Sequence, residues 1–169
     1  MPNAEFQDFV PGAGAERDFR DALGRFATGV TVVTCAGADG PVGMTANSFS
    51  SLSLDPPLIL WAPARGSHRF PAFDAAGHFA VHVLGADQDE ICQAFAKNAD
   101  AFDLLDWHKT PEGVPVFDAC LARFECAKRA AHDGGDHEIH VGEVLRARSR
   151  EGSPLIFFGG AYGGLAGRP

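Results

Sequence analysis

The first third of the chain changes from a helical to an extended hydrophobic pattern, which predicts one helix followed by a β-hairpin. From Glu16 onward, apolar residues recur at helical spacing and share one face: Phe19, Ala22, Leu23, Phe26 and Ala27. We expect Gly29 to end this helix as a left-handed cap. The β-branched run Val30–Cys35 predicts a strand, and Asp39-Gly40 predicts a tight turn into a partner strand that leads to Thr45.

Two buried strands and two short helices are expected in the middle of the chain. The apolar segments Leu58–Ala62 and His78–Leu84 have the pattern of buried strands. Between them, Ser67 is placed to cap a short helix. After the second strand, Asp87 and Glu90 have the spacing of a capping box, so a second helix is predicted to begin there.

The second half of the chain reads mainly as strands. Residues Ala99–Val116 lack periodicity, and we expect an irregular loop there. From Cys120 to Cys126 apolar and polar residues alternate, which predicts a strand with Arg123 and Glu125 on its half-exposed side. A turn at HDGGDH, a long strand and a short last strand complete the pattern.

Together these elements predict a mostly β fold with flanking helices, a small β-barrel with helices at its ends. A length of 169 residues fits one domain with a sizeable core, which we place at residues 16–169. Residues 1–15 contain Pro and Gly clusters without periodicity. We expect them to form an N-terminal arm laid against a partner subunit.

Composition and charge narrow the class of protein. Hydrophobic residues make up 46% and charged residues 21%, which is typical of a globular chain. The formal charge of -8 argues against nucleic acid or an anionic membrane as the main partner. No apolar run reaches membrane-spanning length, and the acidic start does not resemble a signal peptide, so we expect a soluble, cytoplasmic protein. The four cysteines lack C-x-x-C spacing and are expected to be free, buried thiols.

The stretch Gly43–Leu60 is the strongest candidate for a binding site. Short hydroxyl and amide side chains crowd between its two apolar ends: Thr45, Asn47, Ser48, Ser50, Ser51 and Ser53. Such groups donate and accept hydrogen bonds close to the backbone without a full charge. They suit a flat ligand with a polar edge, such as a flavin ring. A Ser-rich turn between strands is the simpler interpretation of the composition alone.

Known phosphate loops are absent from the sequence. It contains no G-x-x-x-x-G-K-[ST], and no G-x-G-x-x-G between a strand and a helix, which excludes P-loop and Rossmann sites. The segment RGSHR offers a different anion site, with Ser67 at a helix start and Arg65 or Arg69 beside it. A capped surface helix with solvated arginines explains the same residues equally well.

The histidine-rich turn near residue 137 is a candidate for metal binding or acid–base chemistry. His137 and His140 have opposite parity on a strand, and no third ligand stands at a familiar spacing, so we predict no metal site. His137, after a Gly-Gly-Asp turn, can donate a hydrogen bond to a ligand. A surface histidine that caps backbone groups is the alternative interpretation. The sequence also lacks a G-x-S-x-G nucleophile motif.

In combination these segments resemble the short-chain flavin reductase family, the reductase components of two-component flavin monooxygenases. The resemblance runs from about Phe19 to Tyr162 and has the landmarks FATGVTVVT, GMTANSFSSLSLDPPL, HFAVHVL, GDHEIHVGEV and PLIFFGGAYGGL. The chain departs from the family where a strand that commonly reads F-x-V-N-V-L has His82 in place of Asn. The resemblance implies an FMN-binding split β-barrel that binds FMN or FAD at the junction of a homodimer.

The resemblance also assigns roles to residues. It implies that Thr45, Ala46, Asn47 and Ser48 lie beside the isoalloxazine ring and ribityl chain, that Ala62, Pro63 and Ala64 pass near the flavin, and that Ser67 and Arg69 lie near the phosphate. His137 matches the histidine near the flavin ring and the nicotinamide. Phe102 and Tyr162 are aromatic candidates for loops that cover the ring, and groups from Asn47 to Ser50 are expected to stabilise charge on the reduced flavin.

The function that follows is hydride transfer from NADH or NADPH to FMN or FAD, with the reduced flavin supplied to a partner monooxygenase. No protein nucleophile is required, because the protein mainly has to stack the two rings. The alternative is a flavin-binding electron carrier of the same fold without NAD(P)H turnover. The least favoured of the three hypotheses is a haem- or metal-binding module that uses the histidines between His132 and His140.

Overall fold

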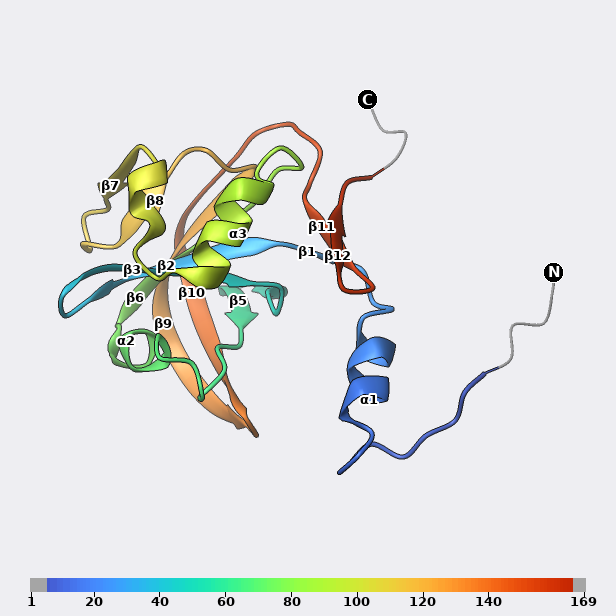
Figure 1. Ribbon diagram of the computed structural model, residues 1–169. Helices are drawn as coiled ribbons and strands as arrows, with labels where there is room; N and C mark the ends of the chain where they lie inside the picture. Colours follow the sequence, from blue (N-terminus) through green and yellow to red (C-terminus); the bar gives the residue numbers. More distant parts are fainter. Residues whose placement is uncertain (1–5, 166–169) are drawn as a thin grey trace.

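Seven strands form one antiparallel sheet in the computed structural model of the chain, which describes residues 6–165 (Figure 1). The strand order across the sheet is β3-β2-β6-β9-β10-β5-β4. Their bounds are β2 Thr31–Gly37, β3 Gly40–Ala46, β4 Ser50–Leu54, β5 Pro57–Trp61, β6 His78–Val83, β9 Ala122–Gly134 and β10 His137–Ser149.

The sheet curls because its two edge strands are consecutive in the chain. Edge strand β3 ends at Ala46 and the opposite edge strand β4 begins at Ser50, so only residues 47–49 join them. Four residue steps span at most about 14 Å, which brings the two edges near each other. No ladder joins β3 to β4 among residues 6–165, so the barrel-like sheet is open there. We call this opening, residues 47–49 with the strand ends beside it, the seam.

Two small sheets accompany the large one. In the first, β11 (Ile156–Phe158) lies between β1 (Thr28–Gly29) and β12 (Ala161–Gly163), and it stands beside the main sheet together with helix α1 (Figure 1). The second pairs β7 (Trp107–Lys109) with β8 (Pro115–Phe117).

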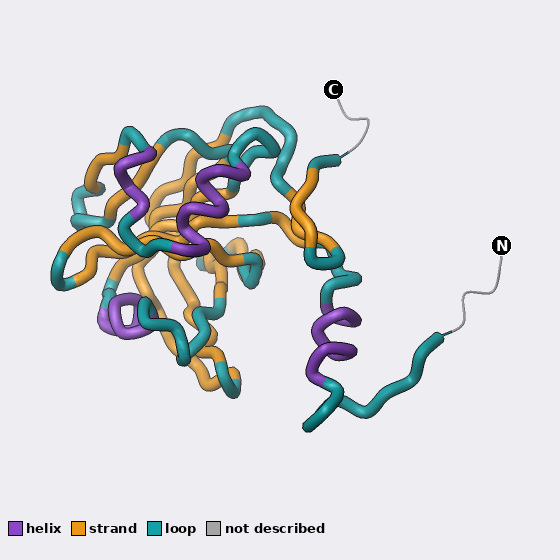
Figure 2. The backbone as a smooth tube through the Cα atoms, in the orientation of Figure 1, coloured by secondary structure: helices purple, strands orange, loops and turns teal. Residues whose placement is uncertain are grey.

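Helices are few and short (Figure 2). They are α1 Glu16–Leu23, α2 Phe70–Ala75, α3 Asp89–Lys97 and the 3-10 helix η1 Ala101–Leu104. Helix α3 packs directly on β3, where a Cβ at Gly43 would overlap the ring of Phe95. No helix among residues 6–165 is long and apolar enough to cross a membrane.

The core lies on both faces of β2, which explains why that strand reads as a continuous apolar run. Val32 packs into a cluster with Phe95, Phe102 and Phe117, while its neighbour Val33 packs into a cluster with Trp61 on the other face. The predicted strands and the hairpin between β2 and β3 are confirmed, and the hairpin's two turn residues are Ala38 and Asp39.

The predicted end of the first helix was wrong. Helix α1 ends at Leu23, and Gly29, the expected cap, pairs with Ile156 in the small sheet. The apolar spacing continues past the true end, but Phe26 and Ala27 lie outside the helix and are exposed. Residues 6–15 of the predicted arm have no regular secondary structure, and residues 1–5 lie outside the described part.

Both predicted helix caps were also misplaced. The residue before α3 is Gln88, not Asp87, and its amide oxygen accepts a hydrogen bond from the Gly85 N–H instead of capping the helix. The residue before α2 is Arg69, not Ser67. The predicted irregular loop Ala99–Val116 contains η1, β7 and part of β8, because its aromatic residues pack into the core.

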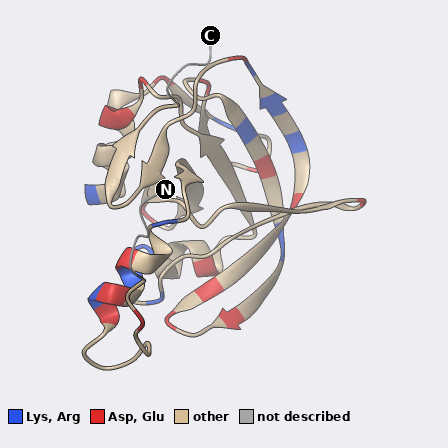
Figure 3. Ribbon diagram, turned by 90° about the vertical axis from the view of Figure 1, so that its right-hand side faces the viewer, with Lys and Arg blue, Asp and Glu red and all other residues tan. Residues whose placement is uncertain are grey.

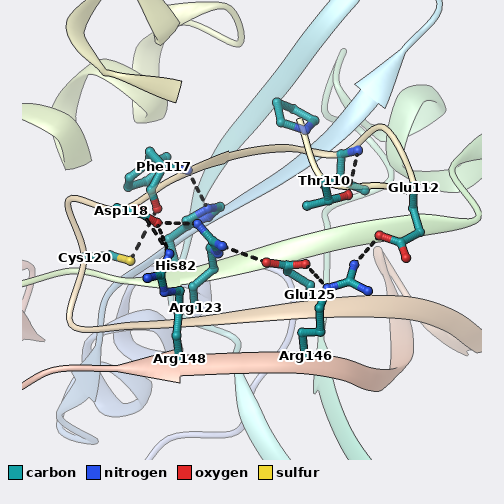
Figure 4. A network of polar contacts seen from close by, with 12 residues as sticks. His82, Thr110, Glu112, Phe117, Asp118, Cys120, Arg123, Glu125, Arg146 and Arg148 are labelled. Carbon is teal, nitrogen blue, oxygen red and sulfur yellow. Dashed lines mark hydrogen bonds and ion pairs between the residues drawn. The ribbon is translucent and has the colours of Figure 1, made fainter. Parts of the chain in front are cut away.

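The largest correction concerns Arg123 and Glu125, which are buried and not half-exposed. Arg123 bonds Asp118 (2.5 Å) and Glu125 (2.8 Å), and Glu125 also accepts from Nε of Arg146 (2.6 Å) (Figure 4). Strand β8 and the residue before it cover this face of the sheet, where Val114 and Val116 pack with Ala80. The buried charges are tolerated there because each charged side chain is paired with one of opposite charge.

His82 lies beside this network and holds β8 to the sheet. Its Nε2 accepts a hydrogen bond from the Phe117 N–H (3.3 Å), so Nδ1 carries the proton and donates to the Val32 carbonyl (3.1 Å). The imidazole stacks on the Phe117 ring, with 3.9 Å between centroids. Burial lowers the pKa of His82 to about 3, so the side chain is neutral at physiological pH.

Candidate functional site

A cavity of about 120 Å³ opens at the seam, where β3 ends beside the small sheet. Thr45, Ala46 and Asn47 form one wall, and Phe157 and Tyr162 from β11 and β12 form the other. Val30 completes the lining. The structure therefore brings three predicted flavin-binding residues together with Tyr162, from the other end of the chain.

The hydroxyl groups of the predicted site fix the backbone. Thr45 donates its proton to the Cys92 carbonyl of α3 (2.7 Å). Ser48 accepts from the Ala62 N–H (2.9 Å) and donates to the Ala62 carbonyl (3.1 Å). Asn47, in contrast, is exposed and lines the cavity. Ser50 is also exposed, donates to the Ser51 carbonyl and does not line the cavity.

A row of backbone contacts extends from the seam to His137. After Ser48 bonds Ala62, the next residues run antiparallel to the start of β10: Pro63 accepts from the Glu138 N–H (3.1 Å), and Ala64 forms a bridge with His137. Arg65 N–H then donates to the Asp136 carbonyl (2.9 Å). Three segments distant in sequence thus become neighbours.

His137 stands at the end of this row with an accessible side chain. Its Nδ1 lies 2.8 Å from Oδ1 of Asp136, and 44% of the side chain is exposed. The hydrogen bond to His137 lowers the pKa of Asp136. Because Asp136 engages Nδ1, the Nε2 nitrogen is the one left to meet a ligand.

Arg69 is a buried cation without a carboxylate partner among the described residues. The residue is 7% exposed, and its guanidinium contacts only the Ala96 carbonyl, at 3.4 and 3.5 Å. Its Nε is buried with no hydrogen-bond partner, and burial lowers the pKa of the side chain. Such a group is suited to an anionic ligand, because a partner would recover the cost of desolvation.

Arg69 and Thr45 both dock on α3, one helical turn apart. Thr45 contacts the carbonyl of Cys92, and Arg69 contacts that of Ala96, four residues later. Four residues of helix rise about 6 Å. The Oγ of Ser67 accepts the Arg69 N–H (3.3 Å), which adds a hydroxyl to the same corner. The cavity at the seam and the buried guanidinium are therefore parts of one region.

The two aromatic candidates differ. Tyr162 packs against Phe157, with 5.1 Å between ring centroids, and both line the cavity. Burial, followed by a hydrogen bond to Cys92, raises the pKa of Tyr162 to about 12, so it remains a neutral phenol. Phe102 is 3% exposed, packs on Phe95 and does not line the cavity at the seam.

Val30 and Phe157 were not identified from the sequence as site residues. Each lies in an apolar run, and only the pairing of β1 with β11 brings Phe157 to the wall of the cavity. Strand pairing between positions so far apart in the chain leaves no local signal.

The other reactive groups do not form a competing site. All four cysteines are free and buried, as predicted, and burial raises the pKa of Cys35 and Cys126 to about 12. His140 is buried against Glu138 (2.9 Å), on the face of β10 opposite to His137. Asp74, Glu138 and His140 lie close together, but Arg65 also bonds Glu138 (2.9 Å) and supplies its positive charge there.

Comparison with known proteins gives a consistent result. The family model described as a flavin reductase like domain matches residues 23–166. The FMN reductase (NADH) SmoA of Agrobacterium fabrum is 61% identical over 163 residues, which cover 96% of this chain and 92% of that protein. The reductase subunit HsaB of a flavin-dependent monooxygenase of Rhodococcus jostii is 40% identical over 88% of this chain and 77% of its own length.

Solved structures agree with this comparison. The NADH:FAD oxidoreductase SgcE6 of Streptomyces globisporus has a TM-score of 0.86 at 37% identity, over 96% of this chain and 100% of that chain. The same protein in complex with NAD and FAD fragments has a TM-score of 0.84 at 38% identity, over 94% of this chain and 98% of that chain.

Proposed function

Because the chain belongs to the flavin reductase-like family, we propose that it transfers hydride from NADH to FMN and supplies the reduced flavin to a monooxygenase. The observation that carries this proposal is the row of contacts that joins Ser48, Ala62, Ala64 and His137. FMN is the first flavin to consider because SmoA is named an FMN reductase, and FAD remains a candidate because SgcE6 is named for FAD.

The residues present fit a flavin nucleotide. The uncompensated, buried guanidinium of Arg69 is suited to its phosphate, with the Ser67 hydroxyl beside it. Asn47 and the backbone from Thr45 to Ser48 hold the polar edge of the ring, and Tyr162 and Phe157 offer it aromatic surfaces. Bound flavin supplies the two-electron acceptor for the hydride of NADH.

His137 is the proposed catalytic residue. Asp136 accepts a hydrogen bond from Nδ1–H, so in the doubly protonated imidazolium Nε2–H donates to a carbonyl of the flavin or the nicotinamide and holds the two rings in register. The hydroxyls of Thr45 and Ser48 keep the wall of the site rigid, because both already donate within the chain. No residue needs to form a covalent bond with the substrate.

A homodimer completes the proposed site. The cavity of one chain, about 120 Å³, is small beside typical ligand pockets of about 300–1,000 Å³. Large apolar side chains in α1 and just after it are uncovered, with Phe19 43%, Leu23 60% and Phe26 78% exposed. A second copy packed on α1 and on the seam would bury this surface and enclose the ring. Residues 16–165 then belong to the domain, with residues 6–15 laid as an arm on the partner.

The proposed setting is the cytoplasm, with a flavin-dependent monooxygenase as the partner that consumes reduced flavin. HsaB is named as the reductase subunit of such an enzyme. An electron carrier without NADH turnover is not favoured, because SmoA and SgcE6 are both named for reduction by NADH.

Steady-state oxidation of NADH and NADPH, with FMN or FAD added, tests this proposal. We expect NADH consumption that increases with FMN and saturates. Stoichiometric flavin retained on the protein, without oxidation of either nicotinamide, would instead support the electron carrier. No oxidation and no flavin binding would remove the flavin assignment altogether.

A further inference from the structure

The end of the β9–β10 hairpin that carries His137 is acidic. Asp133 lies near the end of β9, and Asp136 and Glu138 flank His137 at the start of β10 (Figure 3). Arg65 reaches this end from the segment after β5, and its guanidinium lies 2.9 Å from Glu138 and 3.3 Å from Asp133. The side chains of Arg65 and Glu138 have no part in the hydride transfer proposed above.

Glu138 is the more important of the two acids for holding Arg65. The Asp133 side chain is 84% exposed, so water and salt screen its contact with Arg65. The Glu138 side chain is only 13% exposed. An ion pair that is partly shielded from water is screened less. The contact between Arg65 and Glu138 is therefore the one that fixes the arginine.

His140 holds the Glu138 carboxylate from its other side. One oxygen of Glu138 accepts a hydrogen bond from Nε2 of His140 (2.9 Å), and the second oxygen accepts from Arg65. The His140 side chain is 1% exposed and packs nearly perpendicular to the Trp61 ring, with 5.6 Å between centroids. Burial lowers the pKa of His140, so the neutral ring donates from Nε2. Both carboxylate oxygens are thus engaged.

Arg65 bonds the residue before His137 and the residue after it. Its backbone N–H donates to the Asp136 carbonyl (2.9 Å), and its guanidinium binds the Glu138 carboxylate. Ala64, directly before Arg65, forms the bridge with His137. The carboxylate of Glu138 adds a side-chain contact to the backbone contacts that join this segment to β10. The backbone of His137 is therefore fixed on both sides.

His137 depends on this backbone anchor because its own side-chain contact is exposed. The Asp136 side chain that bonds Nδ1 is 93% exposed, and a contact between exposed groups restrains a ring only weakly. The rate of a reaction between stacked rings is sensitive to displacements of about 1 Å. A shift in the start of β10 would move the His137 imidazole relative to the segment of residues 62–64.

We propose that Glu138 is a positioning residue for hydride transfer: its carboxylate, held between Arg65 and His140, keeps Nε2 of His137 directed at the ring site. The inference rests on the proposed function, because that function gives His137 its part in the reaction. Neighbouring residues of a strand point to opposite faces, so the Glu138 side chain faces away from His137 and acts through the backbone.

A double-mutant cycle with His137 tests this inference. The first-order rate of FMN reduction, at saturating FMN and NADH, is measured for wild type, Glu138→Ala, His137→Ala and the double variant. We expect Glu138→Ala to slow reduction about fivefold or more when His137 is present, and by less than about twofold in the His137→Ala background, because a residue that acts through His137 loses its effect with it. The same slowing factor in both backgrounds would reveal a general structural role and overturn the inference. An unchanged rate in Glu138→Ala would overturn it as well.

Two further variants keep the test decisive. Glu143→Ala removes another acid of β10, one paired with Arg129 at the surface, and should leave the rate unchanged in both backgrounds. Arg65→Gln removes the other half of the pair and should reproduce the pattern of Glu138→Ala. If Glu138→Ala does not fold, the same cycle with Arg65→Gln decides. Wild-type protein that does not reduce FMN, or His137→Ala that reduces it at the wild-type rate, would refute the proposed function or the part of His137 in it instead.

Discussion

Ser48 and Ala62 are joined by two hydrogen bonds, since the Ser48 hydroxyl accepts from the Ala62 N–H and donates to the Ala62 carbonyl. This double link connects the segment after β3 to the segment after β5, across the seam where the sheet stays open. The next residues, Pro63 and Ala64, carry the connection to His137. One serine hydroxyl therefore sets the spacing between the proposed ring-binding wall and the proposed catalytic histidine.

Ser48→Ala should weaken flavin binding and lower stability together. It leaves the Ala62 N–H and carbonyl without their side-chain partner, at a cost of about 1–3 kcal/mol in the free energy of unfolding. Urea denaturation and flavin titration measure the two effects. Ser48→Thr keeps the hydroxyl and is the matched control. Equal flavin affinity in Ser48→Ala and wild type would show that this link does not shape the site.

Arg69→Gln should reduce the preference for FMN over riboflavin, which lacks the phosphate. We expect the Kd of FMN to rise about tenfold or more, while that of riboflavin changes little, because a charge-assisted contact to phosphate is lost. Fluorescence titration with both flavins gives the ratio. Arg65→Gln removes a nearby arginine that is paired with Glu138 and serves as the control. An unchanged ratio in Arg69→Gln would place the phosphate elsewhere.

His82 should make the folded protein sensitive to mild acid. An unfolded histidine takes up a proton near its ordinary pKa of 6.5, whereas folded His82 does so only near about 3. Between these values the unfolded state binds more protons, so stability falls as pH decreases, by up to about 1.4 kcal/mol per pH unit from this group.

Chemical denaturation between pH 7 and 5 tests this against His82→Asn. The variant should show a shallower loss of stability with acid, whatever its stability at pH 7. The pKa of His140 is also lowered by burial, but that residue is present in both proteins and cancels in the comparison. Parallel pH dependences would mean that His82 is protonated in the folded protein.

Substitution of the exposed apolar side chains at the end of α1 and just after it should disrupt the proposed homodimer. Leu23→Ser/Phe26→Ser removes two side chains that a second copy would bury, and sedimentation should show a shift toward monomer with weaker flavin binding. Asp18→Ser, on the polar face of the same helix, should leave the mass unchanged. A wild-type protein that sediments as a monomer and still binds flavin would contradict the proposed homodimer.

Local patterns predicted the strands well, because β-branched and apolar runs such as Val30–Cys35 need only burial on both faces. The local patterns failed where the burial or the secondary structure of a residue depends on partners that are distant in the sequence. Arg123 and Glu125 look exposed until Asp118 and Arg146 are seen to neutralise them. The helix of residues 16–23 was extended to Gly29 because nothing nearby reveals that Gly29 pairs with Ile156.

The candidate site shows the same division. The positions Thr45–Ser48, Ala62–Ala64 and His137 follow from motifs, and the structure brings them together. The sequence motifs did not predict that the hydroxyls bond the backbone, because the carbonyl that accepts from Thr45 belongs to α3, far along the chain. Phe102 was placed at the ring by residue type alone, and it packs in the core.

The most direct test of the account is anaerobic stopped-flow reduction of FMN by NADH, followed through the absorbance of oxidised flavin. We predict rapid bleaching with wild type, and at least a tenfold slower first-order rate with His137→Ala at saturating FMN and NADH. The Kd of FMN in that variant should stay within about threefold of wild type. Bleaching at the same rate in both proteins, or none in wild type, would contradict the claim that the seam holds a flavin beside His137.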